Sequence, residues 1–141
     1  MLGRLERVSF PNWNLYGLDA KIDTGAFTSS LHCHHIEMDH DQESVSFYLL
    51  DPGHPEYEKR KFRSRIRDIR SIRSSNGQIE DRVIIATKME LGGTLYPVEL
   101  SLTDRTDMKY PVLIGRRFLR RRFVVDVSRS YITEKQMNRG E

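Results

Sequence analysis

Alternation of apolar and polar side chains with a period of two constrains the fold of this chain more than any other feature. Such alternation is typical of β strands that bury one face and expose the other. It is clear at 18–22, 45–49 and 61–67, whereas long stretches of helical periodicity are hard to find. The sequence therefore predicts an all-β fold.

Turn residues separate these strands and indicate hairpins. Asn76-Gly77 is a strong two-residue hairpin signal, because both residue types tolerate positive φ, and Gly92-Gly93 marks a second hairpin. We expect the first to join the arginine-rich strand to a strand at 83–87, and the second to lead into a strand at 95–102. The sequence then predicts a loop at 104–109, a short buried run at 112–115, a helix of about two turns at Arg116–Arg122, and a strand at 123–127.

Length and composition favour one domain. The chain has 141 residues, and we expect a single barrel domain over 1–133 and a polar tail over 134–141. Within the domain, the range 32–60 is rich in His, Asp and Glu and is interpreted as a surface insertion. No apolar run is long enough to span a membrane, so we expect no membrane partner. A lone cysteine, Cys33, and the lack of an apolar leader favour a cytoplasmic location.

Positive charge is concentrated in two segments, although the net charge is only +3. Lys59–Arg73 holds eight basic residues against one acidic residue, and Arg116–Arg122 holds five arginines. Such segments form a solvated face, a surface that selects acidic peptides, or a nucleic-acid site. The aromatic residues do not form a stacking platform in the sequence, so we do not expect a nucleic-acid partner.

The segment Ile22–Ala26 indicates catalytic chemistry. It reads Ile-Asp-Thr-Gly-Ala and lies at the end of a strand in which apolar and polar residues alternate. Gly25 lets the backbone turn tightly and leaves space for a substrate. The carboxylate of Asp23 can hold a water molecule, but peptide hydrolysis also requires a second carboxyl. The motif occurs once, so one chain supplies half of such a site. A plain turn after a strand is the alternative interpretation.

A second segment, Leu113–Arg116, reads Leu-Ile-Gly-Arg and leads into the predicted helix. Together with Ile22–Ala26, and with Ile72–Ile79 where a flap hairpin is expected, it resembles the retropepsin-like aspartic peptidases. The resemblance implies a small closed barrel with a flap hairpin and one short C-terminal helix, assembled as a C2 homodimer. It implies catalytic roles for Asp23, Thr24 and Gly25. It also implies substrate contacts from Ala26, Ser75, Asn76, Gly77 and Gln78, and structural support from Gly115 and Arg116.

More specifically, the chain is similar to the bacterial family labelled ATP-dependent zinc proteases. The similar segments are Lys21–Ala26, Ser29–His32, Ser74–Gly77, Leu102–Arg105, Tyr110–Arg116 and Phe123–Ser128. The family often accompanies ATP-grasp glutamate ligases, which implies a functional link and acidic or polyglutamylated substrates. The sequence itself contains no phosphate-binding loop of the form G-x-x-x-x-G-K-[ST].

The zinc in that family label directs attention to His32–His35, which reads His-Cys-His-His. Zinc takes Cys and His ligands, but adjacent residues of an extended chain point to opposite faces. At most two of the four could converge, and His40, His54, Asp39 or Asp41 would have to complete a site. We therefore expect no metal and no other cofactor.

One departure from the retroviral pattern leaves a question open. In retroviral-type enzymes an acidic residue follows the Asp-Thr-Gly-Ala segment and pairs with the late arginine, whereas this chain has Phe27 at that place. The partner of Arg116 is therefore not defined by the sequence. Besides an aspartic peptidase, the sequence allows a non-enzymatic peptide-binding barrel, or the zinc-dependent hydrolase that the family label suggests.

Overall fold

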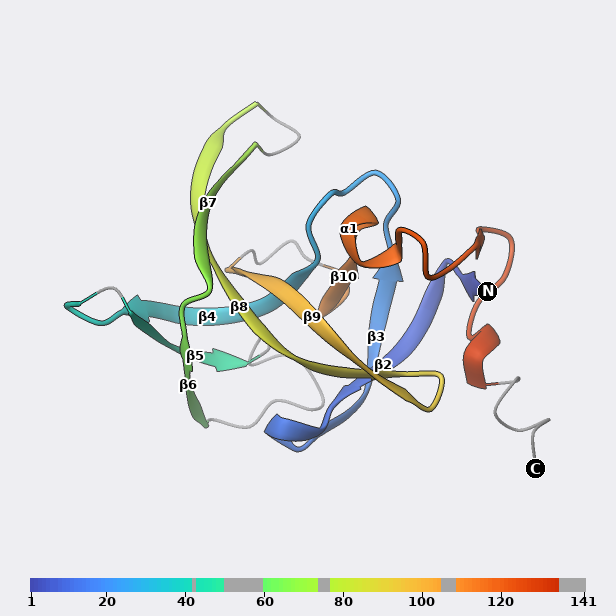
Figure 1. The fold of residues 1–141 in the computed structure, drawn as a ribbon, viewed down its shortest axis with the longest axis horizontal. Coiled ribbons are helices and arrows are strands. Elements are labelled where there is room, and N and C mark those ends of the chain that lie inside the picture. The colour runs from blue at the N-terminus through green and yellow to red at the C-terminus, as the bar shows by residue number, and fades with distance from the viewer. Residues whose placement is uncertain (42, 50–59, 74–76, 105–108, 135–141) are drawn as a thin grey trace.

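Strands make up most of the described chain, as Figure 1 shows. The structure is a computed structural model, and it describes residues 1–41, 43–49, 60–73, 77–104 and 109–134. The elements in chain order are β1 (Leu2–Gly3), β2 (Leu5–Phe10), η1 (Pro11–Trp13), β3 (Leu15–Ile22), β4 (Ser30–Met38), β5 (Ser44–Leu49), β6 (Lys61–Arg65), β7 (Asp68–Arg73), β8 (Ile79–Leu91), β9 (Thr94–Thr103), β10 (Val112–Ile114), α1 (Arg116–Leu119) and β11 (Val125–Asp126).

Six of these strands close into a barrel in the order β10, β3, β2, β8, β9 and β4. The short strand β10 completes the ring, because it pairs in parallel with β3 and antiparallel with β4. Closure leaves none of the six with a free edge. The predicted all-β, closed barrel is confirmed.

The core of the barrel consists of the inward-facing side chains of its strands. Leu18, Ala20 and Ile22 of β3 are buried, as are Val98, Leu100 and Leu102 of β9. The alternation seen in the sequence at these strands therefore describes the buried face correctly. Burial of apolar side chains contributes roughly 25 cal/mol per Å² removed from water, so these faces supply most of the driving force for closure.

Strands β7 and β8 form a hairpin that projects from the barrel, at the upper left of Figure 1. They pair antiparallel from Asp68–Ile84 to Arg73–Ile79, and the rest of β8 pairs with β9 and β2 inside the barrel. A hairpin lies where the sequence predicted one, but its register pairs Arg73 with Ile79 and so differs from that of a two-residue turn at Asn76-Gly77. Its turn at 74–76 lies outside the described residues, and Gly77 has the positive φ of 84° that favours glycine.

The strand predicted over 61–67 is present as β6 but ends early, and a second strand that the sequence did not separate from it, β7, follows at Asp68. β6 ends at Arg65, where the Ile66 N–H still donates to Glu43 beside β5. The next N–H, that of Arg67, donates to Ile84 of β8 instead. The chain changes its partner strand at this point, and the pairing with β8 begins.

The predicted helix begins at Arg116 but ends at Leu119, so it is shorter than expected. Phe118 and Leu119 are its buried residues. Arg120 leaves helical geometry with ψ of 127°, and Arg121 takes a positive φ of 64°. The strand that follows is also shorter than predicted, because only Val125–Asp126 pairs with β1.

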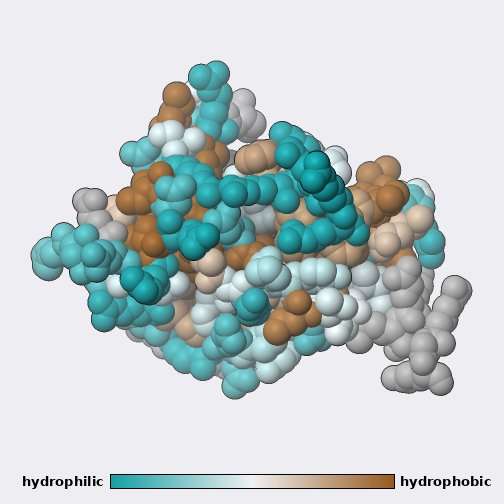
Figure 2. Space-filling model, viewed as in Figure 1, coloured by the Kyte–Doolittle hydropathy of each residue, from teal (hydrophilic) through white to brown (hydrophobic). Residues whose placement is uncertain are grey.

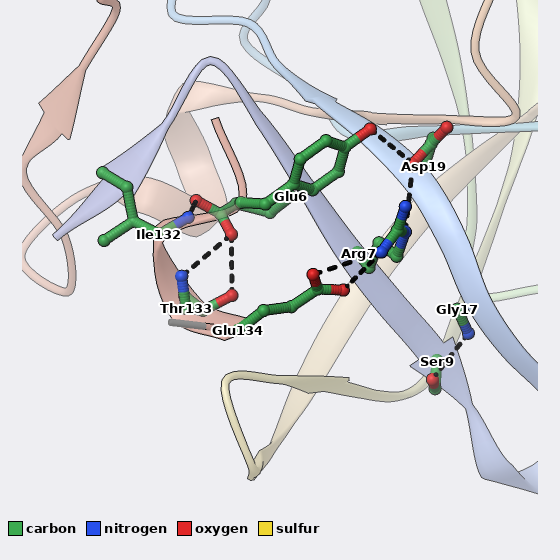
Figure 3. A network of polar contacts seen from close by, with 9 residues as sticks. Glu6, Arg7, Ser9, Gly17, Asp19, Ile132, Thr133 and Glu134 are labelled. Atoms are coloured by element: carbon green, nitrogen blue, oxygen red, sulfur yellow. Dashed lines mark hydrogen bonds and ion pairs between the residues drawn. The ribbon is translucent and has the colours of Figure 1, made fainter. Parts of the chain in front are cut away.

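A buried carboxylate, that of Glu6, fixes the C-terminal segment against β2 (Figure 3). Its Oε2 accepts the N–H groups of Gly3 at 2.7 Å and Ile132 at 3.1 Å. Its Oε1 accepts the N–H and hydroxyl of Thr133 at 3.2 and 2.7 Å. Three of the four donors are backbone N–H groups, which need a partner when buried, so Glu6 links both ends of the described fold.

The domain boundaries expected from the sequence stay a prediction. In the range 32–60, strands β4 and β5 contribute Cys33, Val45 and Phe47 to the core, all of them fully buried. Of the expected tail at 134–141, only Glu134 is described. Within the described residues, no helix is both long and apolar enough to cross a membrane.

Candidate active site

The loop that carries Asp23 follows β3 directly and is fixed at its base. The Asp23 N–H donates to the carbonyl of Ile114 in β10 at 2.9 Å. The Asp23 side chain accepts the Gly25 N–H at 3.0 Å, and its carbonyl accepts the Ala26 N–H at 3.2 Å. These bonds close a tight turn that leaves Thr24 and Gly25 exposed. The Thr24 hydroxyl makes no hydrogen bond within the described part of the chain.

Gly115 lies against the far side of this loop, where a side chain has no space. A Cβ there would lie 2.8 Å from the Phe27 carbonyl oxygen and 2.9 Å from that of Ala26. The Gly115 N–H donates to Ser29 Oγ at 3.0 Å. Only glycine therefore allows the start of α1 to pack this closely on the Asp23 loop.

Arg116 binds the loop itself, and this answers the question that the sequence left open. Its Nη1 donates to the carbonyl oxygens of Thr24 and Gly25, each at 3.1 Å. The guanidinium carbon lies 5.8 Å from the centre of the Phe27 ring. Backbone carbonyls and an aromatic face thus take the place of a carboxylate, and a charged donor strengthens both hydrogen bonds.

An open groove of about 640 Å³ runs between the Asp23 loop and the outer half of the β7–β8 hairpin. Asp23 is the one acidic residue among its described lining residues, and Arg73 and Arg82 are basic. The complete lining is Asp23, Gly25, Ala26, Phe27, Thr28, Ser30, Ser71, Ile72, Arg73, Arg82 and Leu113. The groove therefore has the Asp23 loop on one wall and the hairpin on the other.

The structure brings together part of the site that the sequence predicted. Asp23, Gly25 and Ala26 line the groove, with Thr24 in the same loop and Gly115 and Arg116 behind it. Gly77 and Gln78 lie farther out on the hairpin and are not lining residues. Ser75 and Asn76 lie outside the described residues.

The sequence did not single out Ser71 and Arg82, which line the groove from the hairpin. Their positions follow from the antiparallel register of β7 and β8. Ile72 and Arg73 also line the groove, and they lie within the segment where the sequence predicted a flap hairpin.

The donors of the His-Cys-His-His segment do not fit a zinc site. Cys33 is fully buried, and burial raises the pKa of its thiol to about 12, so the thiolate that zinc requires is disfavoured. His34 and His35 hold their Nδ1 atoms 2.6 Å apart, on a surface beside Tyr48. Among the described residues, no three His, Cys, Asp or Glu side chains gather as metal ligands would.

Comparison with known proteins agrees with this geometry. Residues 1–136 match the family described as "RimB-like: Retropepsin-like aspartic endopeptidase RimB". The chain belongs to the RimB-like family. A solved structure of a protein of unknown function from Legionella pneumophila has the same fold. It covers 94% of this chain and 96% of its own, with a TM-score of 0.72 and 23% sequence identity.

Other relatives of this RimB-like chain are longer proteins. Those from Shewanella halifaxensis and Shewanella pealeana, each named "Probable alpha-L-glutamate ligase", are 37% identical to it. The matches cover 96% and 93% of this chain. They cover only 30% and 29% of the relatives, so the chain spans about a third of their length or less.

Proposed function

We propose that the chain is an aspartic-type peptidase whose active site forms when two copies meet. Each copy contributes one Asp23, and the two carboxyl groups activate a water molecule that attacks the peptide bond. The observation that carries this proposal is the position of Asp23, at the mouth of a groove that the flap-like hairpin borders on its other side. Membership of the RimB-like family supports the same chemistry.

The chemistry follows from placing two carboxyl groups side by side. At about 3 Å, two carboxylates repel by roughly 5 kcal/mol at an effective dielectric constant of 20. One of them therefore keeps its proton, and the pair titrates as a unit. The ionised member takes a proton from water, while the protonated member donates to the carbonyl oxygen of the peptide.

The need for a second copy follows from what the groove contains. Asp23 is alone among the described lining residues in carrying a carboxylate, and hydrolysis by this route requires two. Thr24 and Phe27 are exposed at the same loop, with Phe27 46% exposed although it is a large apolar residue. A C2 axis at this loop would place the Asp23 carboxylates together and cover Phe27.

Acidic or polyglutamylated peptides are the substrates that we propose. Arg73 and Arg82 line the groove, and arginine binds carboxylates with charge-assisted hydrogen bonds. Relatives that contain this domain within a longer protein are named as glutamate ligases. This supports a functional link between the peptidase domain and an enzyme that adds glutamate. The peptidase would then act on the glutamate-containing products.

Hydrolysis of glutamate-rich peptides by the Asp23→Asn variant tests the proposal. We expect cleavage, followed by mass spectrometry, to fall below detection, while the melting temperature stays close to that of the parent protein. Asp104→Asn is the matched control, because Asp104 is exposed and lies outside the groove. Cleavage at the parent rate by Asp23→Asn would refute the aspartic mechanism.

Mixing experiments test the shared site. If each active centre needs Asp23 from two copies, an equal mixture of parent and Asp23→Asn chains that exchange freely retains about a quarter of the parent activity. Independent sites in single chains would retain about half. Retention of half the parent activity, or an active species that sediments strictly as a monomer, would refute an active site shared by two copies.

A further inference from the structure

Three arginines share one carboxylate beside the candidate active site. The carboxylate of Glu99 on β9 lies 3.5 Å from Arg67 Nε, 3.4 Å from Arg70 Nη2 and 3.3 Å from Arg117 Nη1. Its side chain is only 25% exposed. A guanidinium has five N–H donors, whereas a carboxylate offers about four acceptor positions. Arg70 also donates through Nε to Asp68 Oδ2 at 2.9 Å. Even together, the two carboxylates offer fewer acceptor positions than the three guanidinium groups have donors.

A cavity of about 210 Å³ opens at this cluster. Its charged lining residues are Arg70, Arg117 and Arg122 against Glu99, which is an excess of two positive charges. Arg70 Nη1 is buried and makes no hydrogen bond to any residue that the structure describes. An unpaired buried donor is costly, and an additional acceptor in this cavity would remove that cost. Figure 2 shows hydrophilic side chains gathered on this face between the β7–β8 hairpin and α1.

The cavity lies next to the groove of the candidate active site. Thr28 lines both. On the hairpin, Arg70 lines the cavity and Ile72 lines the groove. They are two residues apart on one face of β7, which separates them by about 7 Å along the strand. An extended peptide advances by the same length in about two residues. A peptide in the groove could therefore place a side chain in the cavity.

We propose that this cavity is a subsite for an acidic side chain of the bound peptide, formed by Arg70, Arg117 and Arg122. The inference rests on the proposed function and adds to it the residues that select for acid. Glu99 positions Arg70 and Arg117 and competes with the peptide for them, whereas Arg122 is held by the Phe118 carbonyl, to which its Nη1 donates at 3.0 Å. A carboxylate that enters accepts hydrogen bonds from the guanidinium groups, including the buried donor of Arg70.

Peptide binding to the Asp23→Asn protein tests this subsite without relying on hydrolysis. The probes are two labelled octapeptides, one alternating Glu with Ala and the other alternating Gln with Ala, followed by fluorescence anisotropy. We expect the further change Arg117→Gln to weaken binding of the Glu peptide about tenfold, the loss expected for a charge-assisted hydrogen bond. Binding of the Gln peptide should stay unchanged.

Arg63→Gln is the matched control. Arg63 is similarly exposed, at 68% against 52% for Arg117, and it also pairs with a carboxylate, that of Asp39, but it lies on β6 outside both cavities. We expect it to change neither affinity. Glu99→Gln should tighten binding of the Glu peptide several-fold, because the arginines lose a competing carboxylate.

Equal losses of affinity for the Glu peptide in Arg117→Gln and Arg63→Gln would overturn the subsite, since the peptide would then respond only to the general positive charge of the surface. No preference of the Asp23→Asn protein for the Glu peptide over the Gln peptide would also overturn it. Both results are independent of the peptidase proposal, which fails only if Asp23→Asn still hydrolyses peptides or if a single chain proves sufficient.

Discussion

Replacing Gly115 with alanine tests whether close packing of α1 on the Asp23 loop positions the candidate active site. The added Cβ would lie 2.8 Å from both the Phe27 carbonyl oxygen and the carbonyl carbon of Thr28. These are backbone atoms, so no side-chain rotation relieves the contact. The loop and the start of α1 must move apart by roughly half an ångström to reach an ordinary van der Waals distance.

The expected cost follows from this displacement. Overpacking of this kind costs about 1–3 kcal/mol. For a chain of 141 residues, each kcal/mol lowers the melting temperature by about 3–4 °C. We therefore expect the melting temperature of Gly115→Ala to fall by about 3–12 °C. Activity should fall at least tenfold, because a shift of this size in the Asp23 loop misaligns the reacting groups.

Gly17→Ala separates the effect on the site from the effect on stability. Gly17 has a positive φ of 68°, and no atom lies within 4 Å of the place that a Cβ would take. Alanine in this conformation costs about 1–2 kcal/mol, but Gly17 lies outside the groove. Thermal denaturation and peptide cleavage are measured for both variants. Parent-like stability and activity in Gly115→Ala would refute the packing argument, as would an equal loss of activity in Gly17→Ala.

Two further predictions concern the scaffold. Glu6→Gln should lower the free energy of unfolding by about 2–4 kcal/mol. The glutamine amide replaces one carboxylate oxygen with an NH₂ group, which cannot accept the hydrogen bonds that donors such as Thr133 give to Glu6. Chemical denaturation checks this, and unchanged stability would contradict it. Cys33 should resist iodoacetamide at pH 8 in the folded protein and react fully in denaturant, because burial raises the pKa of its thiol to about 12. Labelling of the folded protein at the rate of a free thiol would show that Cys33 is not protected by burial.

The sequence was most informative where local pattern alone determines structure. Alternation located β3 and β5, and the glycine pair at 92–93 located the β8–β9 hairpin, because these features depend on neighbours in the chain. The division between β6 and β7 was not predictable in this way. It arises where the chain exchanges one partner strand for another, and that choice depends on residues far away in sequence.

The candidate site shows the same distinction. The Asp-Thr-Gly segment was evident in the sequence, but its contact with Arg116 spans more than ninety residues and needed the family resemblance. Even then, the acceptors of Arg116 were missed, because they are backbone carbonyls and leave no signature in the sequence. The hairpin residues Ser71 and Arg82 were not predicted, because their place in the groove depends on how the hairpin lies over the barrel.

The position of the N-terminus bears on how this domain can be joined to others. The N-terminus lies at the right of Figure 1, whereas the β7–β8 hairpin projects at the upper left. An affinity tag or a reporter protein attached through a flexible linker at the N-terminus would start on the side away from the hairpin. Such a fusion should leave peptide entry unobstructed, and immobilising the protein through this end should leave the cleft facing the solution.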